Sequence, residues 1–157
     1  MTTTKKAILT QGLPGAGKSW VLGKNYNLED YTVIDPDEIK KEKADYNDKQ
    51  PEIYHEWSKA EAKFRMAAAI HKEENLVIDG TGTNVEKMAQ WMIELQAAGY
   101  EVELLYVKVK LQTALDRNTA RPRVVPAEII YEKYETITTA FEILASIANT
   151  VTVISND

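Results

Sequence analysis

The sequence predicts an α/β fold, a three-layer α/β/α sandwich around a five-stranded parallel sheet. Five short apolar runs recur along the chain, separated by longer segments in which apolar residues have helical spacing. Runs that are apolar throughout are typical of strands buried on both faces, and helices connecting such strands cover a parallel sheet. With 157 residues, of which 44% are hydrophobic and 27% charged, we expect one domain over residues 1–157 with a single core.

Each of the first three predicted strands stops at residues that favour turns. The first precedes Gly12, the second is followed by Asp35 and Pro36, and the third by Asp79 and Gly80. The fourth run is longer and alternates, and the fifth is the last apolar run of the chain. The predicted strands are 7–10, 32–34, 76–78, 101–109 and 151–154.

Helical spacing is clearest between residues 51 and 71, where apolar side chains recur at intervals of four and three. Pro51 suits the first position of a helix, where its missing N–H is not needed. We expect the apolar stripe of this helix to face the core, and its aromatic members to be core residues rather than a platform for base stacking. The stripe is Ile53, Trp57, Ala60, Phe64 and Ala67.

Further helices are predicted from similar patterns. One covers about 85–98 and ends at Gly99, a residue typical of helix C-termini. Another runs from 126 or 127 toward 148, with an expected break near Thr138, and a shorter helix begins near Lys18. We expect Trp20, in that shorter helix, to pack under the loop that precedes it.

The composition excludes several classes of protein. The chain has no cysteine, which removes disulfide scaffolds, thiol nucleophiles and cysteine-ligated zinc. Its two histidines, His55 and His71, are expected to be surface or packing residues. The longest apolar run, 66–70, is too short for a membrane span, and the first residues lack the apolar core of a signal peptide. We therefore expect a cytoplasmic protein without membrane contact.

The distribution of charge indicates a local anion site. The net charge is −5 and the pI about 5.2, whereas proteins that coat duplex nucleic acid are usually basic. Three of the four arginines, Arg117, Arg121 and Arg123, nevertheless fall close together. Arg117 and Arg121 share a helical face, and Pro122 ends that turn. Because arginine binds phosphate through a planar fork of donors, we expect an arginine-bearing lid at about 111–126, with a solvated basic face as the alternative.

Residues 12–19, GLPGAGKS, match the pattern G-x-x-x-x-G-K-[ST] in full. A predicted strand precedes them and a helix follows, the context of a phosphate-binding loop (P-loop); a glycine-rich turn is the alternative. The glycines let backbone N–H groups turn toward an anion, which the helix dipole also attracts. We expect Lys18 to reach the β- and γ-phosphates and Ser19 to bind Mg²⁺. The predicted nucleotide-binding residues are Gly12, Gly15, Ala16, Gly17, Lys18 and Ser19, together with Arg117 of the arginine segment.

Two aspartates follow predicted strands, at the edge of the sheet where α/β folds bind ligands. We expect Asp79 to hold Mg²⁺ through a water, with capping of the Gly80 turn as the alternative. We expect Asp37 to accept the proton of an attacking hydroxyl, a step worth ~10²–10⁴ in rate. The alternative for Asp37 is an N-cap of a short helix beginning at Glu38, a task that Asp35 can share.

Taken in order, the P-loop, Asp37, Asp79 and the arginine segment resemble the P-loop kinases, over a stretch from Ile8 to about Tyr134. The polynucleotide kinase and zeta-toxin group is the most similar. This resemblance implies the kinase-type P-loop NTPase fold, with ATP and Mg²⁺ as cofactors, and it places the catalytic base at Asp37. The segments VIDPDEIK and YHEWSKAEAKF resemble zeta toxins in particular.

The same resemblance implies residues that contact the acceptor. Polynucleotide kinases carry an arginine three residues after the base, where Lys40 stands in this chain. Their D-x-T segment, like the D-G-T of zeta toxins, corresponds to Asp79-Gly80-Thr81, which implies that Thr81 contacts the acceptor. The arginine segment, followed by Val125 and Pro126, resembles the polynucleotide kinase lid, and Arg123 either joins this lid or touches the acceptor.

We therefore expect an ATP-dependent, Mg²⁺-requiring phosphotransferase that passes the γ-phosphoryl group to an alcohol, the 5′-hydroxyl of a nucleic acid end being the first candidate. A zeta-toxin-like kinase of a nucleotide sugar or other small metabolite is an alternative, as is an NTP-binding switch or ATPase module. An ATPase needs a residue that orients water, and Gln11 is the one glutamine near the P-loop. The residues expected to act in catalysis are Lys18, Asp37, Arg117 and Arg121.

Overall fold

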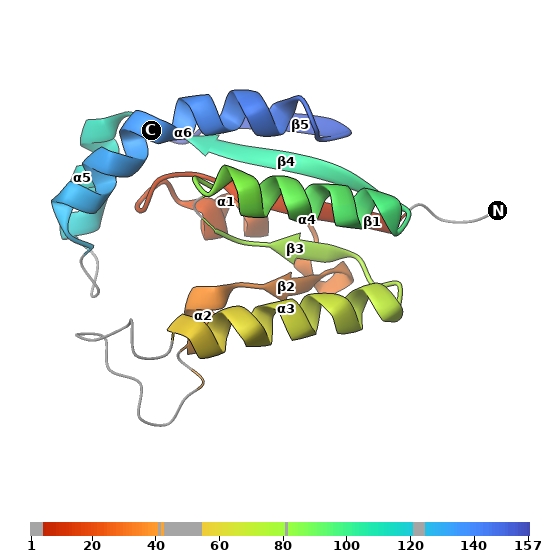
Figure 1. The fold of residues 1–157 in the computed structure, drawn as a ribbon. Coiled ribbons are helices and arrows are strands. Elements are labelled where there is room, and N and C mark those ends of the chain that lie inside the picture. The colour runs from red at the N-terminus through yellow and green to blue at the C-terminus, as the bar shows by residue number, and fades with distance from the viewer. Residues whose placement is uncertain (1–4, 41, 43–54, 81, 121–124) are drawn as a thin grey trace.

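The structure is a computed structural model that describes residues 5–40, 42, 55–80, 82–120 and 125–157, without the side chains of Asp37, Lys40 and His55. Its five strands form one parallel sheet in the order β2-β3-β1-β4-β5 (Figure 1). The α/β fold and the five-stranded parallel sheet are thus confirmed. The strands are β1 (Lys5–Gln11), β2 (Thr32–Ile34), β3 (Leu76–Ile78), β4 (Tyr100–Lys108) and β5 (Thr150–Ser155).

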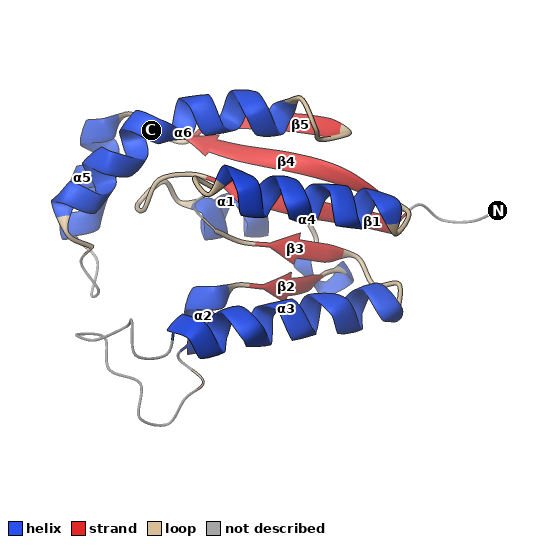
Figure 2. Cartoon of the chain, viewed as in Figure 1, coloured by secondary structure: helices blue, strands red, loops and turns tan. Residues whose placement is uncertain are grey.

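Helices cover both faces of the sheet, as the sandwich prediction requires (Figure 2). In the view of Figure 1, α3, α4 and α6 lie in front of the strands and α1 lies behind them. A short 3₁₀ helix, Leu28–Asp30, precedes β2. The helices are α1 (Lys18–Asn25), α2 (Pro36–Lys40), α3 (His55–His71), α4 (Val85–Ala97), α5 (Leu111–Thr119) and α6 (Ala127–Ala145).

The strand β1 lies at the centre of the sheet and positions the site. Ala7 is opposite Leu76 of β3 on one side and Val102 of β4 on the other. Ile8 and Leu105 are no more than 1% exposed, because the two central strands are covered on both faces. The carboxyl ends of all five strands meet at one edge, on the left in Figure 1, so the loops that leave β1, β2, β3 and β4 gather there.

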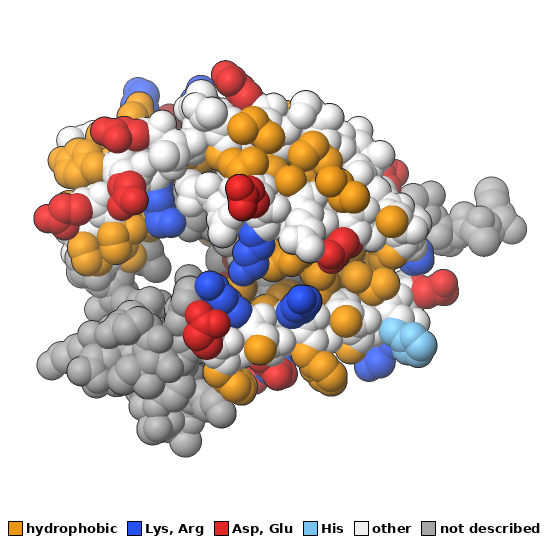
Figure 3. Space-filling model, viewed as in Figure 1, with side chains coloured by type: hydrophobic (Ala, Val, Ile, Leu, Met, Phe, Trp, Pro, Cys, Tyr) orange, Lys and Arg blue, Asp and Glu red, His pale blue; other side chains and the backbone are white. Residues whose placement is uncertain are grey.

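The buried stripe of α3 differs from the prediction. Ala62, Met66 and Ala69 face the core, whereas Phe64 is 68% exposed and Trp57 packs half-buried against the core. The expected stripe is therefore wrong at its centre, and its remaining described members are also exposed, so hydrophobic side chains are visible on the surface over α3 (Figure 3). The helix carries apolar residues on two neighbouring stripes, and the stripe with the smaller side chains packs against the sheet. Spacing alone does not choose between two such stripes.

Two further expectations are corrected. The helix α6 continues without a break through Thr138, because its buried stripe, Ile130, Ile137 and Leu144, packs along the sheet and outweighs the weak helix preference of threonine. Trp20 does not pack under the P-loop but is 59% exposed, and the ammonium group of Lys24 lies 4.7 Å from its ring centroid. None of the described helices has the length and apolar character needed to span a membrane.

Candidate active site

The loop between β1 and α1 requires glycine at two positions. Gly15 and Gly17 have φ angles of +88° and +83°, in the left-handed region that L-residues rarely adopt. Neighbouring atoms also lie close to both residues, backbone atoms at Gly15 and the end of a side chain at Gly17. A Cβ on Gly15 would lie 2.7 Å from the carbonyl oxygen of Ala114, and one on Gly17 would lie 2.5 Å from Nδ2 of Asn156. The loop is therefore fixed by its own backbone and by packing against α5 and the segment after β5.

Side chains from two distant segments hold this loop. Asn156 donates a hydrogen bond from Nδ2 to the carbonyl oxygen of Ala16 at 2.8 Å. Arg117, in the last turn of α5, donates from Nη1 to the carbonyl oxygens of Ala16 at 3.3 Å and Gly15 at 3.4 Å. These donors bind the carbonyl groups on one side of the loop, so the N–H groups of the loop point to the other side. This is the arrangement that an anion-binding nest requires.

The helix α1 begins at the end of this loop. Its N-cap is Gly17, which offers no side chain to cap the first N–H groups, so the positive end of the helix dipole is uncovered. The ammonium nitrogen of Lys18 lies 3.3 Å from the carbonyl oxygen of Gly12, folded over the loop. Ser19 follows with an exposed side chain. These are the groups that hold phosphate and its metal ion in P-loop proteins.

Asp79 lies at the end of β3, next to β1. It is only 8% exposed, and its Oδ1 accepts a hydrogen bond of 2.7 Å from the hydroxyl of Thr10. The N–H group of Gly80 donates to the hydroxyl of Thr10 at 2.9 Å, so Thr10 supports the start of the Gly80 turn. Among the described residues, no lysine or arginine forms an ion pair with Asp79. A buried carboxylate without a cationic partner is suited to hold a cation.

The donor set fits Mg²⁺. Within the described part of the chain, no group of three or more histidine, cysteine, aspartate or glutamate side chains forms a metal site. Mg²⁺ does not need one, because it is commonly held by one or two protein oxygens together with substrate phosphates and waters. Ser19 and Asp79 offer hard oxygen donors from the elements that follow adjacent strands, so they are the residues that would hold the ion.

The helix α2 follows β2 and begins with an aspartate cap. Asp35 accepts the N–H of Glu38 on Oδ1 at 3.4 Å and the N–H of Ile39 on its carbonyl oxygen at 3.0 Å. Asp35 therefore caps α2, which is the role that was the alternative to catalysis for Asp37. Asp37 and Lys40 lie on α2 at the carboxyl edge of the sheet, and their side chains are outside the described set.

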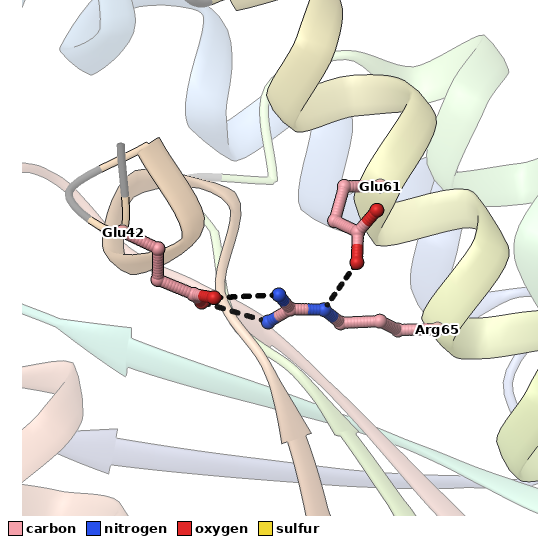
Figure 4. A network of polar contacts seen from close by, with 3 residues as sticks. All are labelled: Glu42, Glu61 and Arg65. Atoms are coloured by element: carbon pink, nitrogen blue, oxygen red, sulfur yellow. Dashed lines mark hydrogen bonds and ion pairs between the residues drawn. The ribbon is translucent and has the colours of Figure 1, made fainter. Parts of the chain in front are cut away.

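An arginine on α3 holds the segment that follows α2 (Figure 4). Arg65 donates to both carboxylate oxygens of Glu42, at 2.7 and 2.8 Å, and from Nε to Glu61 at 3.0 Å. These hydrogen bonds raise the pKa of Arg65, and the bond from Arg65 lowers the pKa of Glu42 below its usual value. This network joins the helix that carries Asp37 to α3.

The arginine segment is described only in part. Arg117 lies against the P-loop, where its guanidinium group contacts backbone carbonyl oxygens. Arg121, Arg123 and Thr81 lie outside the described residues. Asn118, which is buried, joins the two ends of the segment: its Nδ2 donates to the carbonyl oxygen of Val125 at 2.6 Å and its Oδ1 accepts the N–H of Val125 at 2.9 Å.

Gln11 is fully buried and points away from the P-loop. Its Nε2 donates to the carbonyl oxygen of Gly82 at 2.8 Å, and its Cβ and Cγ fill the space that a side chain on Gly82 would need. Gly82 has a φ angle of +75°, so it is glycine for conformational reasons as well. Gln11 thus supports the loop after β3 and is not placed to orient a water at the P-loop.

Sequence reasoning missed Thr10 and Asn156, and it gave Asn118 no role beyond its place in the arginine segment. Thr10 carries no motif of its own. Asn156 had one usable signal, since it follows the last predicted strand and therefore lies at the carboxyl edge where ligands bind.

This fold and this site define a P-loop nucleotide-binding protein of the kinase-like type. The chain belongs to the AAA domain family, which residues 8–144 match. No curated protein matches it in sequence.

Similar solved structures are found for nearly the whole chain. A chain of the PezAT chromosomal toxin–antitoxin system of Streptococcus pneumoniae has a TM-score of 0.68 and 23% identity, over 99% of this chain and 70% of that chain. A chain of the AvrRxo1-ORF1:AvrRxo1-ORF2 complex has a TM-score of 0.75 and 12% identity, over 97% of this chain and 55% of that chain. A chain of the Pnkp1/Rnl/Hen1 RNA repair complex has a TM-score of 0.70 and 14% identity, over 90% of this chain and 47% of that chain. At these identities the likeness shows the fold, and this chain spans about half the length of the last two.

Proposed function

We propose that this protein is an ATP-dependent, Mg²⁺-requiring phosphotransferase that transfers the γ-phosphoryl group to an alcohol. One observation carries the proposal: the carbonyl groups of the glycine loop are engaged, and the buried carboxylate of Asp79, which forms no ion pair with the described residues, follows β3, the strand next to the β1 strand that leads into the loop. An anion cradle beside a cation-binding carboxylate is what a metal–triphosphate complex needs.

Phosphoryl transfer depends mainly on positioning and on charge neutralisation. In the proposed site, the loop N–H groups and Lys18 hold the phosphates, and Ser19 and Asp79 hold the metal. Bound Mg²⁺ would supply charge neutralisation at the phosphate oxygens. Arg117 keeps the loop in its binding conformation, and Arg121 is proposed to close over the transferred group.

The chemical step is an in-line displacement at the γ-phosphorus. A bond forms between the acceptor oxygen and phosphorus while the bond to the bridging β–γ oxygen breaks, and ADP leaves. The hydroxyl proton passes to Asp37, which is therefore the proposed general base. Thr81, Lys40 and Arg123 are the proposed acceptor contacts, by resemblance to the polynucleotide kinase and zeta-toxin group.

The acceptor is proposed to be the 5′-hydroxyl of a nucleic acid end, on the strength of the lid resemblance. A nucleotide sugar or related metabolite is the second candidate, favoured by the VIDPDEIK and YHEWSKAEAKF segments. The similarity to the fold of an RNA repair complex and of a toxin–antitoxin system supports both candidates equally. The side-chain amide of Gln11 donates a hydrogen bond to Gly82 and is not placed to orient a water. This counts against hydrolysis by water as the main reaction.

The test incubates the protein with γ-labelled ATP and Mg²⁺ and offers a 5′-hydroxyl oligonucleotide, a nucleotide sugar, or water alone. Label on the oligonucleotide or on the sugar supports transfer to an alcohol and identifies the acceptor class. Release of free phosphate alone, at a rate unchanged by either acceptor, would overturn the proposal. Lys18→Ala is the control, because label transfer that persists in this variant comes from a contaminating enzyme.

A further inference from the structure

A pocket lies beside Leu13 of the P-loop, where the ends of β4 and β5 meet α6. Its volume is about 480 Å³, within the usual range for small-molecule sites. We call it the rear pocket. Leu13 forms part of its wall and belongs to the P-loop, but the residues assigned above to phosphate and metal are not in its lining. Among the described lining residues, Leu13 is therefore the one that the rear pocket shares with the proposed active site.

Tyr106 of β4 lines the rear pocket. Its side chain is largely buried, at 8% exposed, and within the described structure its hydroxyl makes no hydrogen bond. Its ring is held by Phe141 of α6, with the two ring centroids 4.9 Å apart. Burial raises the pKa of Tyr106, and nearby Tyr134 raises it further, so this hydroxyl remains a donor at neutral pH. It can therefore donate a hydrogen bond to an acceptor atom in the pocket.

Other donors surround the same space. Tyr134 and Thr138 of α6 line the rear pocket from one side, and Ser155 of β5 from the other. Each of these side chains ends in a hydroxyl group that can donate to a carboxylate, sulfonate or phosphate oxygen. The apolar side chains of Leu13 and Ile137 form the remaining wall, so the pocket offers an apolar surface beside a set of donors.

The rim of the rear pocket is more positive than negative. Lys108, opposite Ser155 in the sheet, and Lys110 both line it, and neither forms an ion pair with a carboxylate in the described part of the chain. The one acidic side chain is Asp157. Its Oδ1 already accepts the N–H of Lys110 at 2.7 Å and the hydroxyl of Thr113 at 3.2 Å, which lowers the pKa of this aspartate.

We infer that the rear pocket is a binding site for a small organic anion, one with an apolar or aromatic body and an oxyanion group. The oxyanion accepts hydrogen bonds from Tyr106 and Tyr134 and lies near Lys108, while the apolar body contacts Leu13 and Ile137. A neutral sugar fits less well, because the described lining residues offer hydroxyl and ammonium donors, no side-chain amide, and one carboxylate whose Oδ1 is already engaged.

The binding test uses 8-anilino-1-naphthalenesulfonate, an aromatic sulfonate whose fluorescence rises on binding, with the full chain and saturating Mg-ADP. Tyr106→Phe keeps the ring and removes the hydroxyl, and is expected to raise the Kd about tenfold, since hydrogen bonds to charged groups are among the stronger ones. Lys108→Ala is expected to raise it about threefold. Tyr131→Phe and Lys72→Ala change exposed residues outside the pocket and serve as matched controls.

Two competitors then test the chemical class. Phenyl phosphate is expected to displace the probe, and benzyl alcohol, its neutral counterpart, is not. Equal affinity in Tyr106→Phe and the wild type, equal displacement by both competitors, or loss of the probe on adding Mg-ADP would each overturn the inference. No acceptor or turnover enters this test, so its result is independent of whether phosphoryl transfer is found. A circular dichroism melt of each variant confirms that it is folded.

Discussion

Gly17 combines two constraints at one residue, a left-handed backbone and the contact with Asn156. We expect Gly17→Ala to abolish measurable binding of Mg-ATP and to lower the free energy of unfolding by about 1–3 kcal/mol, since the left-handed conformation alone costs ~1–2 kcal/mol for an L-residue. Calorimetric titration and urea unfolding measure the two effects.

Gly23 provides the matched control for this substitution. It lies within α1, and a Cβ there would meet nothing within 4 Å. Gly23→Ala should therefore bind Mg-ATP normally and gain up to about 1 kcal/mol of stability from the better helix preference of alanine. If both variants lost binding equally, the loop geometry would not be the cause.

Asp37 is the residue on which the proposed chemistry depends most. Asp37→Asn should keep the affinity for ATP and reduce label transfer by ~10²–10⁴, the usual contribution of a general base. Asp35→Asn is the control, because asparagine caps a helix about as well as aspartate. Unchanged transfer in Asp37→Asn would remove this residue from the proton-transfer step.

At the scale of secondary structure elements, the P-loop depends on the segment that follows β5. Asn156→Ala removes the 2.8 Å hydrogen bond to Ala16 and should weaken Mg-ATP binding about fivefold, which corresponds to the ~1 kcal/mol net value of such a bond. Asn149→Ala is the control: Asn149 bonds the N–H of Val102 near the opposite end of the sheet, so its loss should reduce stability without changing the affinity for nucleotide.

The link between α2 and α3 makes stability depend on pH. Glu42 has a lowered pKa in the folded state, so its pairing with Arg65 contributes stability above the unfolded value of 4.5, and this contribution is lost as the pH falls through the folded value. Wild type should therefore have a higher urea midpoint than Arg65→Met at pH 7, and the two midpoints should converge below pH 4.5. Lys63→Met, on the same helix and exposed, should show no such convergence.

At the scale of the whole molecule, a ligand held only by the folded loop must stabilise the entire domain. Mg-ATP at a hundred times its Kd should contribute about 2.7 kcal/mol, and so raise the melting temperature by about 5–10 °C for a chain of this size. Scanning fluorimetry measures this shift. A similar shift in Lys18→Ala would mean that the nucleotide binds elsewhere.

Most of the fold could be predicted from the sequence because its strands are short, apolar and ended by glycine, aspartate or proline. The second and third strands, 32–34 and 76–78, have the predicted bounds. The buried face of α3 could not be predicted, because both of its apolar stripes satisfy helical spacing and only packing against the sheet decides between them. The unbroken α6 shows the same effect, since burial of Ile137 outweighs the adjacent threonines.

The candidate site could be predicted where a motif specifies backbone conformation, as in the P-loop. The residues that support the site could not be predicted, because Thr10 and Asn156 act through contacts with residues far away in the sequence. The cap role of Asp35 was one of two possibilities that spacing left open, and the hydrogen bond to Glu38 decides it.

The contact between Ala16 and Asn156 joins residues 140 positions apart. On the ribosome, the strand before the glycine loop emerges early, yet the loop gains its last support only after β5 has been synthesised and has docked at the edge of the sheet. Nascent chains that stop short of this strand should therefore fail to retain nucleotide, so that binding competence is acquired late in translation.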